Sequence, residues 1–253
     1  MFVDYYSFKI HSLTHSKFIH SKFIHSLIQN SFIQNSKFIH SKFIHSLISM
    51  RYIELFLLFI LLPCSFLLDY PAPIKVGLVL SCFAFSIWIV VRDKPVKRQI
   101  LWSLNNWDFW KGLLLRLSVG LVAAFVLMYF YKPDMLFIIF KDMRLFFMIV
   151  FIYSLLSVTA QEFAYRTFFF HRYRDLFNNS TIFLIVNALL FSLAHIMFEN
   201  VVVLLLTFVG GLFFAYTYQK TKSLLVVSIE HAIYGLWLFV LGIGDLLAFP
   251  MPS

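Results

Sequence analysis

Residues 145–170 read LFFMIVFIYSLLSVTAQEFAYRTFFF, an apolar run that a carboxylate and a guanidinium interrupt. A run of this length and composition is typical of a helix that spans a lipid bilayer. Ionisable groups at that depth are energetically costly, so they are candidates for a functional site. Because Glu162 and Arg166 are one helical turn apart, they can neutralise each other on one helix face.

The composition of the whole chain indicates a multi-pass membrane protein. Of its 253 residues, 61% are apolar and 13% are charged, whereas soluble globular domains are about half apolar and about a quarter charged. Apolar runs lie at about residues 52–68, 76–91, 112–131, 145–170, 182–198, 201–218 and 224–242. We therefore predict an all-α fold, a polytopic helical bundle of about seven transmembrane helices.

The net charge of +9 is explained by membrane topology and does not indicate nucleic acid binding. Lysine and arginine lie between the apolar runs, and the basic residues of 92–98 directly follow the second run. Such clusters are typical of cytoplasmic loops, so we predict a bacterial inner-membrane protein with a cytoplasmic amino terminus. Three tryptophans among polar residues at 99–111 predict an interfacial helix before the third span.

The first 49 residues are a low-complexity repeat, in which SKFIH recurs at residues 16–20, 21–25, 36–40 and 41–45. A period of five residues matches neither an α-helix nor a heptad. We interpret residues 1–49 as a translated tandem repeat upstream of a start at Met50. A histidine-rich metal-binding tract or a basic surface arm is the alternative interpretation. Residues 50–253 are expected to form a single membrane domain.

A few polar residues inside the last four spans are predicted to gather at one depth. If the spans on either side of residues 178–179 form an antiparallel hairpin, Glu162 lies 16 residues before Asn178 and His195 lies 17 after it. At about 1.5 Å per residue, both lie about 24–26 Å from the turn. His231 enters from the last span, so it can join them.

Further candidates lie near these residues. Asn187 and Phe191 share a helix face with His195, and Tyr234 continues the face of His231 one turn on. Glu230, directly before His231, is a second carboxylate. The glycine pair at 210–211 predicts a close approach of neighbouring helices. A structural ion pair and hydrogen bonds between helices are the alternatives to a functional site. The grouping of Glu, Arg and two His in the last four spans favours a site.

Three short segments carry a resemblance to a known family. They are QEFAYR at 161–166, FSLAH at 191–195 and HAIYG at 231–235. In this order they resemble the motifs Glu-Glu-x-x-x-Arg, Phe-x-x-x-His and His-x-x-x-Asn of the CPBP family. That family comprises the CAAX proteases and bacteriocin-processing enzymes and is also called the Abi family of intramembrane proteases. The resemblance covers residues 145–242.

The resemblance implies hydrolysis of a peptide bond by an activated water. In the family, the first Glu and the second-motif His activate the water, and the third-motif His and Asn stabilise the oxyanion. A carboxylate in an apolar site is a usable general base, and donors aimed at the developing charge lower the barrier. This sequence departs at two positions, because Gln161 replaces the base and Gly235 replaces the Asn. An amide does not take up a proton at neutral pH.

Three hypotheses for the function follow. The first is a variant intramembrane peptidase, in which Glu162 or Glu230 acts as base with His195, His231 stabilises the oxyanion, and Arg166 holds Glu162. Gln161, Asn187, Phe191 and Tyr234 are expected to support this site. The second is a non-proteolytic scaffold that binds a membrane partner, and the third is a proton- or ion-coupled transporter.

The expected partners are the lipid bilayer and a membrane-associated peptide or protein substrate. Water activation requires no cofactor. Glu162, His195 and His231 are nevertheless residue types that bind zinc, so a metal is the alternative use of the same set.

Overall fold

The computed structural model describes residues 48–93 and 107–247. Residues 1–47 of the predicted repeat (1–49) and most of the predicted interfacial helix at 99–111 lie outside these ranges. The chain divides into two units, Met1–Tyr52 and Ile53–Ser253, and the fold described below is that of the second. Every regular element in the described ranges is a helix, which confirms the predicted all-α fold.

The long apolar helices confirm a polytopic helical bundle. Within the described ranges, six are long and apolar enough to cross a membrane: Ile48–Ser65, Ala72–Arg92 (α3), Trp107–Tyr131 (α5), Met143–Leu176, Ser180–Phe198 and Val201–Thr221 (α10). The seventh predicted span corresponds to a shorter apolar helix of 17 residues, Leu224–Val240 (α11). The protein is therefore a multi-pass membrane protein.

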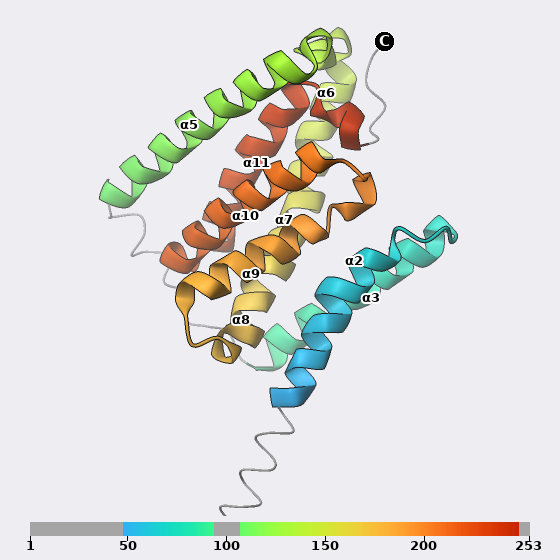
Figure 1. Ribbon diagram of the computed structural model, residues 1–253, viewed down its shortest axis with the longest axis vertical. Coiled ribbons are helices and arrows are strands. Elements are labelled where there is room, and N and C mark those ends of the chain that lie inside the picture. The colour runs from blue at the N-terminus through green and yellow to red at the C-terminus, as the bar shows by residue number, and fades with distance from the viewer. Residues whose placement is uncertain (1–47, 94–106, 248–253) are drawn as a thin grey trace, which may run out of the picture. The chain divides into compact units, whose positions relative to one another are not determined.

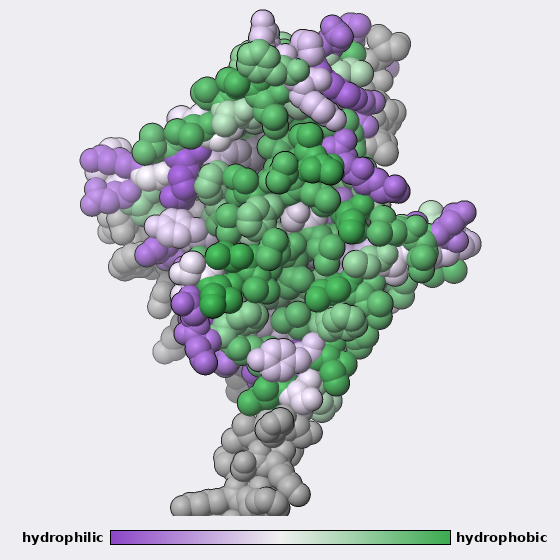
Figure 2. Space-filling model, viewed as in Figure 1, coloured by the Kyte–Doolittle hydropathy of each residue, from purple (hydrophilic) through white to green (hydrophobic). Residues whose placement is uncertain are grey.

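Large apolar side chains are exposed over much of the surface, as a lipid environment requires. Phe130 is 80% exposed and Leu156 is 68% exposed. Figure 2 shows apolar side chains covering most of the visible face, with hydrophilic residues gathered toward its margins. Since water would disfavour so much contiguous apolar surface, this distribution matches a protein embedded in hydrocarbon.

Short polar caps define where the last three helices begin. The Asn179 side chain accepts hydrogen bonds from the backbone at the start of α9 (Ser180–Leu193), at 2.7 and 3.1 Å. Asn200 caps α10 in the same way at 2.9 and 3.2 Å, and Ser223 caps α11 at 3.3 Å. These side chains satisfy amide groups that have no partner within the helix. The connections are therefore tight, and α9 lies against α10 (Figure 1).

The long helix Met143–Leu176 changes its winding around the segment that carries Glu162. It begins as α6 (Met143–Ile152), widens to a π-helical turn at Tyr153–Val158, and returns to α-helix in α7 (Thr159–Glu162). A second π-helical turn, Phe163–Phe168, leads into α8 (Phe169–Tyr173). Wider turns rotate the side chains that follow, and such turns recur at functional sites.

Close helix packing positions the remaining spans. A Cβ atom on Gly211 would lie 3.1 Å from the Ala188 Cα, so α9 and α10 approach at the predicted glycine pair. Helix α5 lies beside α11 (Figure 1). The Tyr234 hydroxyl donates to the Arg116 carbonyl at 2.7 Å, and Trp237 Nε1 donates to the Leu121 carbonyl at 2.9 Å. These two bonds join α5 to α11.

The first described helix is joined to α8 by one carboxylate. Glu54 accepts two hydrogen bonds from Arg172, at 3.0 and 2.7 Å, and one from the Tyr173 hydroxyl at 2.8 Å.

We expect Glu54→Gln to lower the free energy of unfolding by about 1–2 kcal/mol, because charge-assisted bonds are lost from a partly exposed pair. Denaturant unfolding in detergent measures this change. Glu199→Gln, at an exposed position, is the control, and equal stability of the two variants would contradict the prediction.

Candidate functional site

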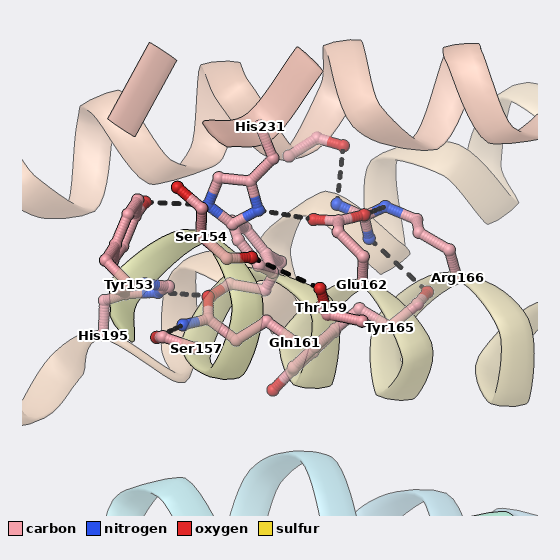
Figure 3. Close-up of polar contacts among 12 residues, drawn as sticks. Tyr153, Ser154, Ser157, Thr159, Gln161, Glu162, Tyr165, Arg166, His195 and His231 are labelled. Atoms are coloured by element: carbon pink, nitrogen blue, oxygen red, sulfur yellow. Dashed lines mark hydrogen bonds and ion pairs between the residues drawn. The ribbon is translucent and has the colours of Figure 1, made fainter. Parts of the chain in front are cut away.

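A fully buried carboxylate lies at the centre of the polar residues. Glu162, the last residue of α7, has no exposed side-chain surface. Its Oε2 is 3.1 Å from Arg166 Nε, and its Oε1 is 2.8 Å from His231 Nδ1 in α11. Figure 3 shows Glu162 between these two partners. The structure therefore forms the predicted ion pair and adds His231 to it.

Arg166 connects this carboxylate to the neighbouring helices. Its Nη1 donates to Asn187 Oδ1 in α9, and its Nη2 lies 3.4 Å from the Gly211 carbonyl in α10. The guanidinium carbon lies 5.0 Å from the ring centre of Phe191 and 5.9 Å from that of Phe214. Asn187 and Phe191, which the sequence places on one face, thus hold Arg166 through a hydrogen bond and a cation–π contact.

His231 is held in one orientation by contacts on several sides. Its ring stacks on Phe214 with centroids 4.5 Å apart and an interplanar angle of 18°, and it meets the edge of Phe191 at 5.6 Å. Its second nitrogen, Nε2, is 3.2 Å from the Tyr153 hydroxyl. A carboxylate at one nitrogen orients an imidazole and defines the role of the other nitrogen. Glu162, His231 and Tyr153 therefore form a continuous hydrogen-bonded chain (Figure 3).

A cavity of about 390 Å³ lies beside this chain. Its walls are mostly aliphatic and aromatic side chains from α9, α10 and α11, with contributions from α3 and α5. The polar lining residues are Tyr153, Ser157, Gln161, His195, Thr207, His231 and Tyr234. A concave, largely apolar space with a few oriented polar groups is typical of a ligand or substrate site.

Gln161 faces the cavity from the motif that opens the resemblance. Its Nε2 donates to Ser157 Oγ at 2.9 Å, which fixes the orientation of the amide. Its Oε1 is buried and has no hydrogen-bond partner among the described residues. Because an unpaired buried acceptor is costly, this oxygen is suited to a donor that enters the cavity.

His195 lies in the turn that follows α9, close to the end of the predicted fifth span. Its Nδ1 is 2.9 Å from the Phe191 carbonyl. A carbonyl only accepts, so Nδ1 carries the hydrogen, and Nε2 is the acceptor of the neutral ring. The Phe191 ring is 5.0 Å from His195 and also contacts His231. Among the described residues no hydrogen bond joins His195 to Glu162, so the two lie in one region without direct contact.

Glu230 faces a different set of residues from its neighbour His231. Its buried carboxylate is 3.9 Å from Arg116 Nη2 in α5. The same guanidinium nitrogen donates to Thr217 in α10 at 3.2 Å. Glu230 is not among the residues that line the cavity. Consecutive residues of a helix point in different directions, so the second carboxylate belongs to the α5, α10 and α11 contact.

The described residues contain no group of three or more His, Cys, Asp or Glu placed to hold a metal ion. In the zinc alternative, Glu162 and His231 contact each other at 2.8 Å, while Glu162 is also 3.1 Å from Arg166. Both carboxylate oxygens thus already face donors, and His195 is not gathered with them. This arrangement does not fit a three-ligand site.

Three residues with roles in this arrangement were not identified from the sequence: Tyr153, Ser157 and Arg116. Tyr153 and Ser157 precede Gln161 at intervals of four residues, and all three line the cavity. That spacing was a usable signal, because residues four apart share a helix face. No comparable signal existed for Arg116, because an arginine in the first turns of an apolar run can equally extend its side chain to the membrane surface.

The fold and the site together define a polytopic membrane protein with a polar centre buried between its last helices. Residues 143–237 match the family model described as type II CAAX prenyl endopeptidase, Rce1-like. The match contains all three motifs and confirms the resemblance to the CAAX proteases over these residues. The comparisons with curated proteins and with solved structures gave no match.

Proposed function

We propose that this protein is an intramembrane peptidase that hydrolyses a peptide bond of a membrane-associated protein or peptide. The observation that carries the proposal is the Glu162–His231 hydrogen bond of 2.8 Å at the wall of a cavity that His195 also lines. The matched family supports the same class of reaction. We place the protein in a bacterial inner membrane, and the basic residues at 92–98 support a cytoplasmic amino terminus.

The geometry favours His195 as the general base over the two carboxylates. Glu162 is occupied by Arg166 and His231, and Glu230 faces Arg116 outside the cavity. His195 lines the cavity, and its Nδ1–H is held by a backbone carbonyl. Its Nε2 is then an acceptor at the pocket wall, which is the property that proton abstraction requires. We assign Glu162 the role of positioning His231.

The proposed reaction balances with the groups that line the cavity. Gln161 Oε1 accepts a hydrogen bond from a water molecule and orients it. The water oxygen attacks the carbonyl carbon of the peptide bond while His195 Nε2 takes one of its protons. The oxyanion is stabilised from the side of the cavity that His231 forms. The C–N bond then breaks as His195 returns the proton to the leaving nitrogen, which yields a carboxylic acid and an amine.

The family description supports a prenylated carboxyl-terminal tail as the first substrate to test. Such tails end in Cys-aliphatic-aliphatic-X with the lipid on the cysteine. The apolar walls of the cavity are compatible with a lipid-modified peptide. We expect the full chain in proteoliposomes to cleave a farnesylated peptide of this type, as read by mass spectrometry. The same peptide without the lipid is the matched control substrate.

The variant His231→Gln keeps a polar side chain but loses the imidazole that Glu162 orients. We expect this variant to lower kcat by roughly 10²-fold, the scale of losing one group that stabilises the transition state. Equal product from wild type and His231→Gln would contradict the proposed function. If only the lipid-free peptide is cleaved, the proposed peptidase activity stands, but a prenylated tail is excluded as its substrate.

One observation favours a second function, a scaffold that binds the same kind of peptide without cleaving it. No carboxylate lines the cavity among the described residues. The variant Gln161→Glu separates the two functions, because it restores a group that can take up a proton. If the protein is a peptidase with His195 as base, the wild-type protein cleaves the peptide, and Gln161→Glu changes the rate. If it is a scaffold, the wild-type protein binds the peptide without cleaving it, and only the Gln161→Glu variant gives product.

A further inference from the structure

The space beside Gly235 is filled by a tyrosine from another helix. A Cβ atom built on Gly235 would overlap the Tyr153 hydroxyl and would lie 2.5 Å from its ring carbon Cζ. No other residue type therefore fits at this position while Tyr153 keeps its place. The resemblance places an asparagine side chain at this position, so the phenol occupies the volume of the missing amide.

The hydroxyl also has the contacts of a site residue. It is 3.2 Å from His231 Nε2, and Tyr153 lines the cavity together with His231 and Gln161. Gly235 lies one turn after His231 on α11. A side chain at position 235 would lie beside His231 and would extend there from α11. The phenolic group of Tyr153 lies in the same place, but it extends from the π-helical turn Tyr153–Val158.

We propose that Tyr153 is a catalytic residue, whose hydroxyl donates a hydrogen bond to the oxyanion, and that Gly235 is glycine because it makes room for this phenol. This inference rests on the proposed peptidase function. It deepens that function by assigning the donor that the sequence lacks at position 235.

The hydrogen-bonded chain behind Tyr153 supports this role. The Tyr153 hydroxyl hydrogen rotates about the C–O bond, so it can turn from His231 Nε2 toward the cavity and donate to an oxyanion there. Behind it, Glu162 orients His231 through Nδ1 at 2.8 Å and is itself held by Arg166 at 3.1 Å. A donor that is held in place before the charge develops stabilises an oxyanion more than a neutral carbonyl.

Packing alone is the competing explanation, and it makes a different prediction. The Tyr153 ring meets the edge of Phe239 at 5.1 Å, and a phenylalanine would keep this contact. The test is therefore Tyr153→Phe, which removes only the oxygen. Tyr218→Phe is the matched control, because Tyr218 is buried in α10 and does not line the cavity.

In proteoliposomes with the farnesylated peptide, we expect Tyr153→Phe to lower kcat on the order of 10²-fold with little change in KM. Tyr218→Phe should keep the wild-type kcat. A kcat of Tyr153→Phe equal to that of Tyr218→Phe, or a change confined to KM, overturns the inference while the peptidase stands. An inactive wild type overturns both.

An exchange of the two side chains tests the shared volume independently of activity. We expect Gly235→Asn alone to lower the thermal unfolding midpoint, because its Cβ overlaps the phenol. Tyr153→Ala with Gly235→Asn should restore the midpoint relative to either single variant, and should restore part of the kcat that Tyr153→Ala loses. Additive effects of the two changes would show that the positions do not share one volume, and would overturn the inference.

Discussion

Arg166→Met is expected to lower the free energy of unfolding by about 3–5 kcal/mol, the scale of breaking one side of a buried ion pair. Arg166 and Glu162 have no exposed side-chain surface, and their charged groups are 3.1 Å apart. Methionine keeps much of the side-chain volume but leaves the Glu162 charge without its nearest cation. It also removes the donor to Asn187 and the link to the Gly211 carbonyl. Reversible unfolding in detergent, followed by circular dichroism, measures the change.

Two comparisons separate the buried charge from the loss of an arginine in general. Arg92→Met removes an exposed guanidinium that contacts Trp88 at the end of α3, and it should change stability by well under 1 kcal/mol. The double variant Glu162→Gln with Arg166→Met should be more stable than Arg166→Met, because no uncompensated charge remains. Similar losses for Arg166→Met and Arg92→Met would refute the structural role of the pair.

His195→Gln is expected to lower kcat by about 10²–10⁴-fold, the usual contribution of a general base. Glutamine keeps a polar side chain of similar length, but it does not take up a proton. The backbone fold should survive, because the one described hydrogen bond of the His195 side chain is to the Phe191 carbonyl within the same turn. The measurement is peptide cleavage in proteoliposomes at saturating substrate, with thermal unfolding as the check on folding.

The matched control is His171→Gln, which changes a histidine paired with Asp93 at 3.2 Å, away from the cavity. It should retain the wild-type kcat. In His195→Ala, added imidazole should restore part of the rate, since a small base enters the space that the ring vacates. Wild-type kcat in His195→Gln would remove His195 as base and return that role to a carboxylate.

The three motifs were enough to identify the class of protein, but not the division of roles among their residues. Glu162 lies behind His231 when viewed from the cavity, so the proposed function gives it a positioning role. Glu230, the other carboxylate beside a histidine, contacts α5 through Arg116. Both differences arise because the direction of a side chain depends on which neighbours its helix packs against.

The sequence by itself determined the class of fold and the short-range pairs. Apolar run length predicts spans, because a bilayer leaves few alternatives to a helix with satisfied backbone groups. Spacing by four predicts that Glu162 and Arg166 meet, and that Asn187 and Phe191 share a face, since these contacts depend only on helix geometry.

Only the tertiary structure decided which faces meet across helices. Tyr153 and His231 are 78 positions apart and contact each other, and no local pattern relates them. Two π-helical turns, Tyr153–Val158 and Phe163–Phe168, also flank α7. Each changes the direction in which the following side chains point, relative to a regular α-helix. The rotation and depth of each helix follow from packing such as that at Gly211 and Gly235. For that reason the contact between the Tyr153 phenol and His231 follows only from the tertiary structure.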